Sequence, residues 1–166
     1  TLLELLIVVL IIGILASIAI PSYQKAVLKS RYTSLKNLTH AIADAEEIFY
    51  LTNGEYAKDF NDLHIGMPGG QDPDKSTKTH AVYDWGSCYL NTTGKNMKQV
   101  YCRRNFMGYF LRLAHSPKEP GSRICMVFTD GPEFNLRTKM CLKETGWTGN
   151  KPYASDTTYK GYKYME

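Results

Sequence analysis

Residues 1–27 read TLLELLIVVLIIGILASIAIPSYQKAV, and this stretch decides the fold of the chain. From Leu5 to Tyr23 there is a run of 19 residues without a charged side chain. As an α-helix such a run spans about 28 Å, which is close to the thickness of the hydrocarbon core of a bilayer. The sequence therefore predicts an N-terminal helix that is long and apolar enough to cross a membrane.

Glu4 is the one charged residue in residues 1–23. A carboxylate in an apolar segment costs about 2.5–3.5 kcal/mol on membrane insertion, so it needs a partner. A cleaved signal peptide starts with basic residues and has a shorter apolar core, a plain membrane anchor has no use for a carboxylate, and a buried core helix would be shorter. The nearest cation of a suitable kind is a free N-terminal amine, either of the same chain or of a neighbour.

Gly13 and Pro21 weaken the same helix locally. Pro21 removes one backbone donor and disfavours helix in the residues before it. Gly13 lowers the helix propensity by about 1 kcal/mol relative to Ala. We expect the helix to bend or unravel between these two residues.

Residues 1–27 closely resemble the mature N-terminus of type IV pilins and of the related pseudopilins. Weaker similarity continues to about Leu63, where FYLTNGEYAKDFNDL (residues 49–63) resembles the helix exit of that family. The resemblance implies an α+β, type IV pilin-like fold, in which a long N-terminal helix packs on an antiparallel β-sheet head.

The resemblance also implies functional residues and partners. Glu4 matches the family glutamate that serves methylation and assembly by neutralising the N-terminal amine of a neighbouring subunit. Gly13 and Pro21 bound the segment that loses helical order in assembled filaments. A prepilin peptidase would cut a short basic leader before an aromatic or Met residue, which we expect immediately before Thr1. The subunit would be held in the inner membrane until the pilus assembly machinery adds it to a filament of identical subunits.

Beyond Gln24 the sequence becomes polar but keeps a helical pattern, with no Gly or Pro through residue 50. An apolar stripe is formed by Leu28, Leu35, Leu38, Ile42 and Phe49. One stripe predicts one partner surface, which we expect to be the chain's own sheet.

The helix is expected to stop near Leu51, because Asn53 and Gly54 are residues typical of a helix end. These signals divide the chain into a helix over residues 1–51 and a head over residues 52–166. The helix itself divides into an apolar half, residues 1–23, and an amphipathic half, residues 24–51.

Charges are ordered along the amphipathic half. Asp44, Glu46 and Glu47 follow four basic residues, which are Lys25, Lys29, Arg31 and Lys36. We hypothesise that the basic stretch of one subunit meets the acidic stretch of an axially shifted neighbour; the alternative is a solvated charged face. The basic residues alone would place the head in the cytoplasm by the positive-inside rule. We follow the cysteines instead, since the leader would supply the deciding cytoplasmic charges.

The head reads as a loop followed by short strands. Residues 66–80 are rich in Gly and Pro, and the strand-like stretches after them are residues 81–90, 98–103, 107–115 and 123–129. Consecutive short strands predict an antiparallel sheet, one face of which covers the helix stripe. From Cys141 onward the chain is polar and rich in turn residues.

Four cysteines lie in the head: Cys88, Cys102, Cys125 and Cys141. No CxxC pair occurs, so we expect two disulfides and an oxidising compartment. Four cysteines allow three connectivities. We favour Cys88–Cys102 with Cys125–Cys141, because each pair flanks a segment short enough for a hairpin to close.

The sequence contains few motifs that indicate catalysis or ligand binding. The four histidines are scattered, and neither a metal-binding spacing nor a phosphate-binding glycine loop is present, so we expect no metal, no cofactor and no enzyme. Asn91-Thr92-Thr93 matches the N-glycosylation triplet. The C-terminal tail mixes Tyr with Lys, which suits nucleic-acid binding, although an exposed edge strand or an interface rim is the more common explanation.

We therefore expect a structural subunit, in particular a major pilin, of an extracellular filament on the bacterial surface. Such a filament would serve adhesion, motility or DNA uptake. The alternatives are a pseudopilin of a type II secretion system and a membrane-anchored binding module that does not polymerise.

Overall fold

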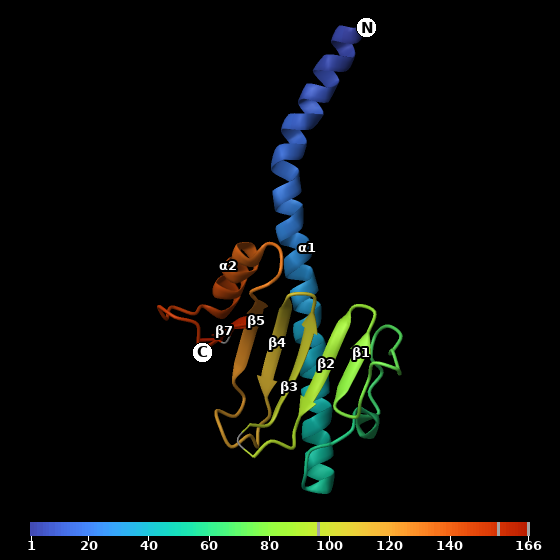
Figure 1. The fold of residues 1–166 in the computed structure, drawn as a ribbon, viewed down its shortest axis with the longest axis vertical. Helices are drawn as coiled ribbons and strands as arrows, with labels where there is room; N and C mark the ends of the chain where they lie inside the picture. Colours follow the sequence, from blue (N-terminus) through green and yellow to red (C-terminus); the bar gives the residue numbers. More distant parts are fainter. Residues whose placement is uncertain (96, 156, 166) are drawn as a thin grey trace. The chain divides into compact units, whose positions relative to one another are not determined.

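The computed structural model describes residues 1–95, 97–155 and 157–165. Two compact units divide the chain, Thr1–Arg31 and Tyr32–Glu166. The elements in chain order are α1 (Leu2–Asn53), the 3-10 helix η1 (Phe60–Leu63), β1 (His80–Tyr83), β2 (Gly86–Asn91), β3 (Gln99–Arg104), β4 (Met107–Arg112), β5 (Arg123–Phe128), α2 (Phe134–Thr145), β6 (Ala154–Ser155) and β7 (Tyr159–Lys163). This is an α+β arrangement (Figure 1).

The end of α1 has the predicted chemistry. Gly54 follows the helix with φ of 74°, and its N–H donates to the carbonyl of Tyr50 at 2.8 Å. A left-handed residue here pairs a carbonyl of the last turn that the helix leaves open, and glycine adopts this conformation without steric cost. The helix ends at Asn53, two residues beyond the end expected from the sequence.

The seven strands of the described residues form one antiparallel sheet in the order β1-β2-β3-β4-β5-β7-β6. In the second unit, the residues of α1 from Tyr32 onward lie behind this sheet (Figure 1). One row of paired residues on that face consists of Ala81, Cys88, Cys102, Tyr109, Cys125 and Tyr162, none of them more than 5% exposed. Ala81, Cys88 and Cys102 share one core with Leu35 and Ile42 of α1. The alternation of strand side chains thus produces the face that receives the helix.

One predicted strand, residues 81–90, is wrong. The structure breaks it into β1 and β2, which form a hairpin that pairs Tyr83 with Gly86. A side chain at Gly86 would place its Cβ 2.2 Å from the carbonyl oxygen of Arg103 on β3. Gly86 therefore marks a close approach of two backbones at a turn, which the continuous strand pattern concealed.

The other three predicted strands correspond to β3, β4 and β5. The strand expected over residues 107–115 ends at Arg112, three residues early. Asn105 makes the tight turn before it, with φ of 52°.

Helix α2 was not predicted from the sequence, whereas a strand in the tail was one explanation considered for it. Residues 134–145 form α2, and β7 joins the sheet beside β5. The buried residues of α2 are Arg137, Cys141 and Thr145, so its inward face is largely polar. A search for apolar periodicity misses such a helix.

Two disulfides stabilise the head. Cys88 bonds to Cys102 directly across β2 and β3, with 4.1 Å between the Cα atoms. Cys125 on β5 bonds to Cys141 on α2, with 5.7 Å between the Cα atoms. These are the two pairs that the sequence favoured, and the second one ties α2 to the sheet.

Candidate assembly surface

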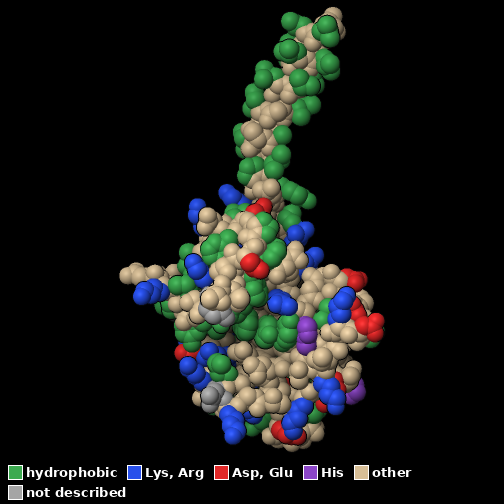
Figure 2. All heavy atoms as spheres, in the orientation of Figure 1, with side chains coloured by type: hydrophobic (Ala, Val, Ile, Leu, Met, Phe, Trp, Pro, Cys, Tyr) green, Lys and Arg blue, Asp and Glu red, His purple; other side chains and the backbone are tan. Residues whose placement is uncertain are grey.

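The first unit, Thr1–Arg31, exposes apolar side chains at successive positions along its helix, and Figure 2 shows one face of this surface. Their exposed fractions range from 46% at Ile7 to 88% at Leu2. The exposed large apolar residues of this unit are Leu2, Leu3, Leu5, Leu6, Ile7, Val8, Val9, Leu10, Ile11, Ile12, Ile14, Leu15, Ile18, Ile20 and Tyr23. Soluble proteins rarely leave so large a continuous apolar surface in water, so this surface is suited to a membrane or to other protein. Among the described helices, α1 alone has the length and composition to cross a bilayer.

Glu4 lies within this apolar surface. Its carboxylate accepts a hydrogen bond from the amino group of Thr1 at 2.5 Å, and both side chains are about three-quarters exposed, at 75% and 76%. Exposed ion pairs contribute little in water, but the same pair gains strength where water is excluded. The main-chain nitrogen of Thr1, at the start of the helix, lies within reach of this carboxylate.

Gly13 and Pro21 both lie inside continuous helix. A Cβ at Gly13 would meet nothing within 4 Å, so packing within the chain does not require glycine there. Pro21 has no N–H to donate to the carbonyl of Ser17, which leaves one gap in the helix ladder. Unravelling of this segment stays a prediction.

The residues of the predicted apolar stripe in the amphipathic half differ in how deeply they are buried. Leu35 and Ile42 are buried at 3% and 0% exposure, and Leu38 and Phe49 pack against the same core while partly exposed. Leu28 belongs to the first unit and is partly exposed.

Three polar residues of the buried face of α1 were not predicted from the sequence. Tyr32, Thr39 and Glu46 are at most 1% exposed. The Tyr32 hydroxyl lies 2.9 Å from that of Tyr164, and Thr39 donates to the carbonyl of Leu35 at 2.8 Å. The three positions repeat at helical spacing, but an apolar search passes over them because their side chains are polar.

Two residues of the predicted acidic stretch, Glu46 and Glu47, are engaged within the head, whereas Asp44 is exposed, and the contact with a neighbouring subunit stays a prediction. Glu46 is fully buried, and its Oε2 accepts the Ala57 N–H at 2.9 Å. The Oε1 of Glu47 accepts the Tyr56 hydroxyl at 2.9 Å and the Ala114 N–H at 2.7 Å. Both carboxylates hold the end of α1 to the loops of the head.

Burial gives Glu46 unusual acid–base behaviour. Its Oε1 has no hydrogen-bond partner among the described atoms. Loss of solvation disfavours the charged form and raises the pKa of Glu46 to about 7, although the Ala57 N–H opposes the shift.

The remaining face of α1 in the second unit is exposed. Its exposed residues include Asn37, Ala41, Asp44, Ile48 and Leu51. Ile48 and Leu51 are large apolar side chains, 67% and 81% exposed. The amphipathic half therefore has one face on the sheet and one face open.

The predicted glycosylation triplet lies at an accessible place. Asn91 ends β2 and is exposed, as is Thr93. Thr92 between them is buried and donates its hydroxyl to the carbonyl of Ala57 at 2.6 Å. Modification of Asn91 stays a prediction.

The aromatic residues of the C-terminal tail are engaged within the head. Tyr162 is 5% exposed, Tyr164 contacts Tyr32, and the rings of Trp147 and Tyr153 meet edge to face at 5.9 Å. The buried Tyr162 offers no free face for stacking on nucleic-acid bases, and nucleic-acid binding by the tail stays a prediction.

A metal site needs several ligating side chains close together in the described part of the chain. No group of three or more His, Cys, Asp or Glu side chains there is placed to hold a metal ion. Comparison with known proteins adds no relative, since no family model, no curated protein and no solved structure matches the chain.

Proposed function

We propose that this chain is the structural subunit of an extracellular filament of the type IV pilus kind. One observation carries the proposal: a helical segment whose apolar surface is exposed on all sides, interrupted by a single carboxylate at Glu4. The subunit would be stored in the inner membrane and then transferred to the filament.

Burial of the first unit supplies the driving force. Removing a Leu, Ile or Val side chain from water contributes about 1.5–3 kcal/mol, and this unit exposes many of them. Lipid can cover this surface before assembly. In a filament, the same surface of neighbouring copies would cover it, so one segment serves both states.

Glu4 would set the register of assembly. A carboxylate surrounded by apolar side chains is stable only with a cation, and an N-terminal amine of an adjacent copy supplies one. A copy at a wrong axial position would leave Glu4 unpaired, at a cost of about 3–5 kcal/mol.

The contacts would repeat from head to tail. Such an interface joins two different patches of the same chain, and it extends into an open helical polymer when the rotation does not close. The open face of α1, with Ile48 and Leu51, is available for contact with a neighbouring copy.

Electron microscopy of material sheared from native cells, with mass spectrometry of its protein, tests this proposal. We expect long filaments made mainly of this chain. Glu4→Gln should lower their yield by at least about tenfold while the chain stays in the membrane, since tenfold corresponds to only 1.4 kcal/mol of a buried charge pair. Glu55→Gln, a change at an exposed carboxylate of the head, should leave the yield unchanged.

Other outcomes would contradict the proposal. A chain that stays in the membrane and yields no surface filaments would identify a membrane-anchored binding module. A short fibre confined to the periplasm would identify a secretion pseudopilus. Equal filament yields for the Glu4→Gln and wild-type chains would remove Glu4 from assembly.

A further inference from the structure

A pocket of about 500 Å³ lies where the β4–β5 loop, the α2–β6 connection and the end of β7 meet. Pockets of about 300–1,000 Å³ are of the size that binds small molecules. We call it the Trp147 pocket, and its functional lining consists of Glu119, Ser122, Arg123, Trp147, Tyr153 and Lys163. All of these residues belong to the second unit.

Two rings form a pre-built wall of the Trp147 pocket. Trp147 and Tyr153 meet at an angle of 76°, with 5.9 Å between the ring centroids. The indole N–H of Trp147 donates to the carbonyl of Lys151 at 2.9 Å, which fixes the ring. An apolar wall held in this way binds a flat group with little loss of side-chain entropy.

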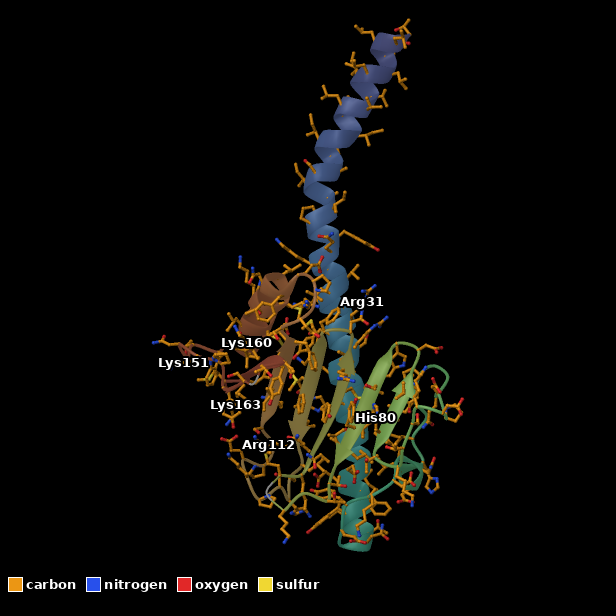
Figure 3. All side chains as sticks on the ribbon, viewed as in Figure 1. Arg31, His80, Arg112, Lys151, Lys160 and Lys163 are labelled. Atoms are coloured by element: carbon orange, nitrogen blue, oxygen red, sulfur yellow. A yellow bond between two sulfur atoms is a disulfide. The ribbon has the colours of Figure 1, made fainter. Side chains whose placement is uncertain are left out.

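Cations dominate the charge of the Trp147 pocket. Among the described residues, Glu119 is the lining carboxylate, and the Oε2 of Glu119 already accepts hydrogen bonds from the Tyr153 hydroxyl and from the guanidinium of the buried Arg112. The hydrogen bond from Tyr153 and the charges of Arg112 and Lys163 lower the pKa of Glu119. Arg112 on β4 and Lys163 on β7 lie on either side of β5 (Figure 3).

The Oε1 of Glu119 lies 3.9 Å from the Nζ of Lys163, so Glu119 pairs with both Arg112 and Lys163, and the three cations Arg112, Arg123 and Lys163 still outnumber this carboxylate. The guanidinium of Arg123 lies 5.3 Å from the ring centroid of Tyr164, and the Nζ of Lys163 lies 5.4 Å from that of Tyr153. Cations placed beside aromatic rings recognise an anionic group attached to an apolar body.

Ser122 is a buried part of the lining. It is 7% exposed, and its Oγ is enclosed by the protein and has no hydrogen-bond partner among the described atoms. The Trp147 pocket does not reach this hydroxyl, and its lack of a partner is a cost to the fold. The loop before Ser122 is strained too, because Glu119 has φ of 46°, and strained backbone gathers at ligand sites.

We propose that the Trp147 pocket binds a small organic carboxylate that carries a planar ring. Arg123 and Lys163 hold the carboxylate, and Trp147 and Tyr153 flank the ring. This binding site belongs to the head alone and is independent of whether the chain polymerises.

Titration of the full chain in a non-ionic detergent with benzoate, and separately with benzamide, tests the site. Trp147 fluorescence reports binding in a Trp85→Phe background. We expect benzoate to bind at least about tenfold more tightly than the neutral amide, because hydrogen bonds to a charged group are the stronger ones. Arg123→Gln and Lys163→Gln should each abolish that preference, whereas Lys151→Gln, which removes the same charge outside the lining, should preserve it. Equal affinities for the two probes, an equal loss with Lys151→Gln, or no binding of benzoate would overturn the proposal.

Ser122→Ala is a control inside the lining. It should leave the benzoate affinity unchanged, because the Ser122 Oγ is enclosed and does not reach the ligand. It should also leave the melting temperature of the free protein unchanged or raise it, since an unpaired buried hydroxyl is removed. A loss of benzoate affinity as large as that of Arg123→Gln would contradict the assignment of the carboxylate to Arg123 and Lys163.

Discussion

The two parts of α1 differ in what covers them. Residues 1–31 leave their apolar side chains exposed, whereas residues 32–53 bury Leu35, Ile42 and even Glu46 within the head. One continuous helix therefore packs within the head in its second part and exposes an apolar surface in its first part. The comparison teaches that the head is stable by its own packing, while the first part is stable only with lipid or protein around it.

Removal of residues 1–28 should have the largest effect on behaviour in solution. The shortened chain keeps the sheet, both disulfides and the buried face of α1, so it should be a soluble monomer in detergent-free buffer. The full chain should need detergent, because its exposed apolar surface associates in water. Size-exclusion chromatography with light scattering measures both. Aggregation of the shortened chain, or a full chain that is monomeric without detergent, would break the comparison.

Two isoleucines of the same helix sharpen the contrast. Ile42→Ala should lower the free energy of unfolding of the head by about 2–5 kcal/mol, because a fully buried side chain leaves a cavity. Ile11→Ala, at a side chain that is 51% exposed, should change it by less than about 0.5 kcal/mol. Urea unfolding of the full chain in detergent, followed by tryptophan fluorescence, gives both values. Equal losses would mean that Ile11 also belongs to the folding core.

Glu46→Gln should change how stability depends on pH. The pKa of Glu46 is raised to about 7 in the folded state, so between its unfolded pKa near 4.5 and about 7 the folded state holds a proton that the unfolded state has lost. Stability from this group is therefore present at low pH and is lost as the pH rises through 7. The loss amounts to about 3 kcal/mol at most.

The difference in stability between the wild-type and Glu46→Gln chains separates the effect of Glu46 from that of other titrating groups. The Glu46→Gln chain should match the wild type at pH 5 and exceed it at pH 8, since an amide oxygen still accepts the Ala57 N–H. Urea midpoints at the two pH values measure the effect. A variant that is less stable at pH 8 would show that Glu46 is held as a stabilising anion.

Gly13→Ala should have the smallest effect on the head, whose unfolding free energy should not change. It should raise helix propensity by about 1 kcal/mol, and the open space around Gly13 admits the methyl group. Amide hydrogen exchange over residues 13–21 should therefore slow down. Protection of this segment in the wild type equal to that of residues 5–12 would show that it is no weak point.

Regular apolar patterns predicted much of this structure. The helix end at Asn53 and Gly54, the central strands and both cysteine pairs follow from local signals that the structure preserves. Each of these depends on side chains whose chemistry matches their position, such as a glycine at a left-handed helix end.

Polar residues in buried positions explain what the sequence did not show. Helix α2 was missed because Arg137 and Thr145 occupy its inward face, and Glu46 was assigned to a subunit contact because carboxylates are usually solvated. The Trp147 pocket assembles from loops that are far apart in sequence, so no local pattern could reveal it.

The central claim is that copies of this chain cover the exposed part of α1. A photo-cross-linking experiment tests this claim most directly. Benzoylphenylalanine replaces Ile11 in native cells and is activated by light. Mass spectrometry then identifies the cross-linked products in sheared material. The account predicts adducts between two copies of the chain, joined through residues 1–31. Adducts to lipid or to unrelated membrane proteins alone, with none between copies, would contradict it.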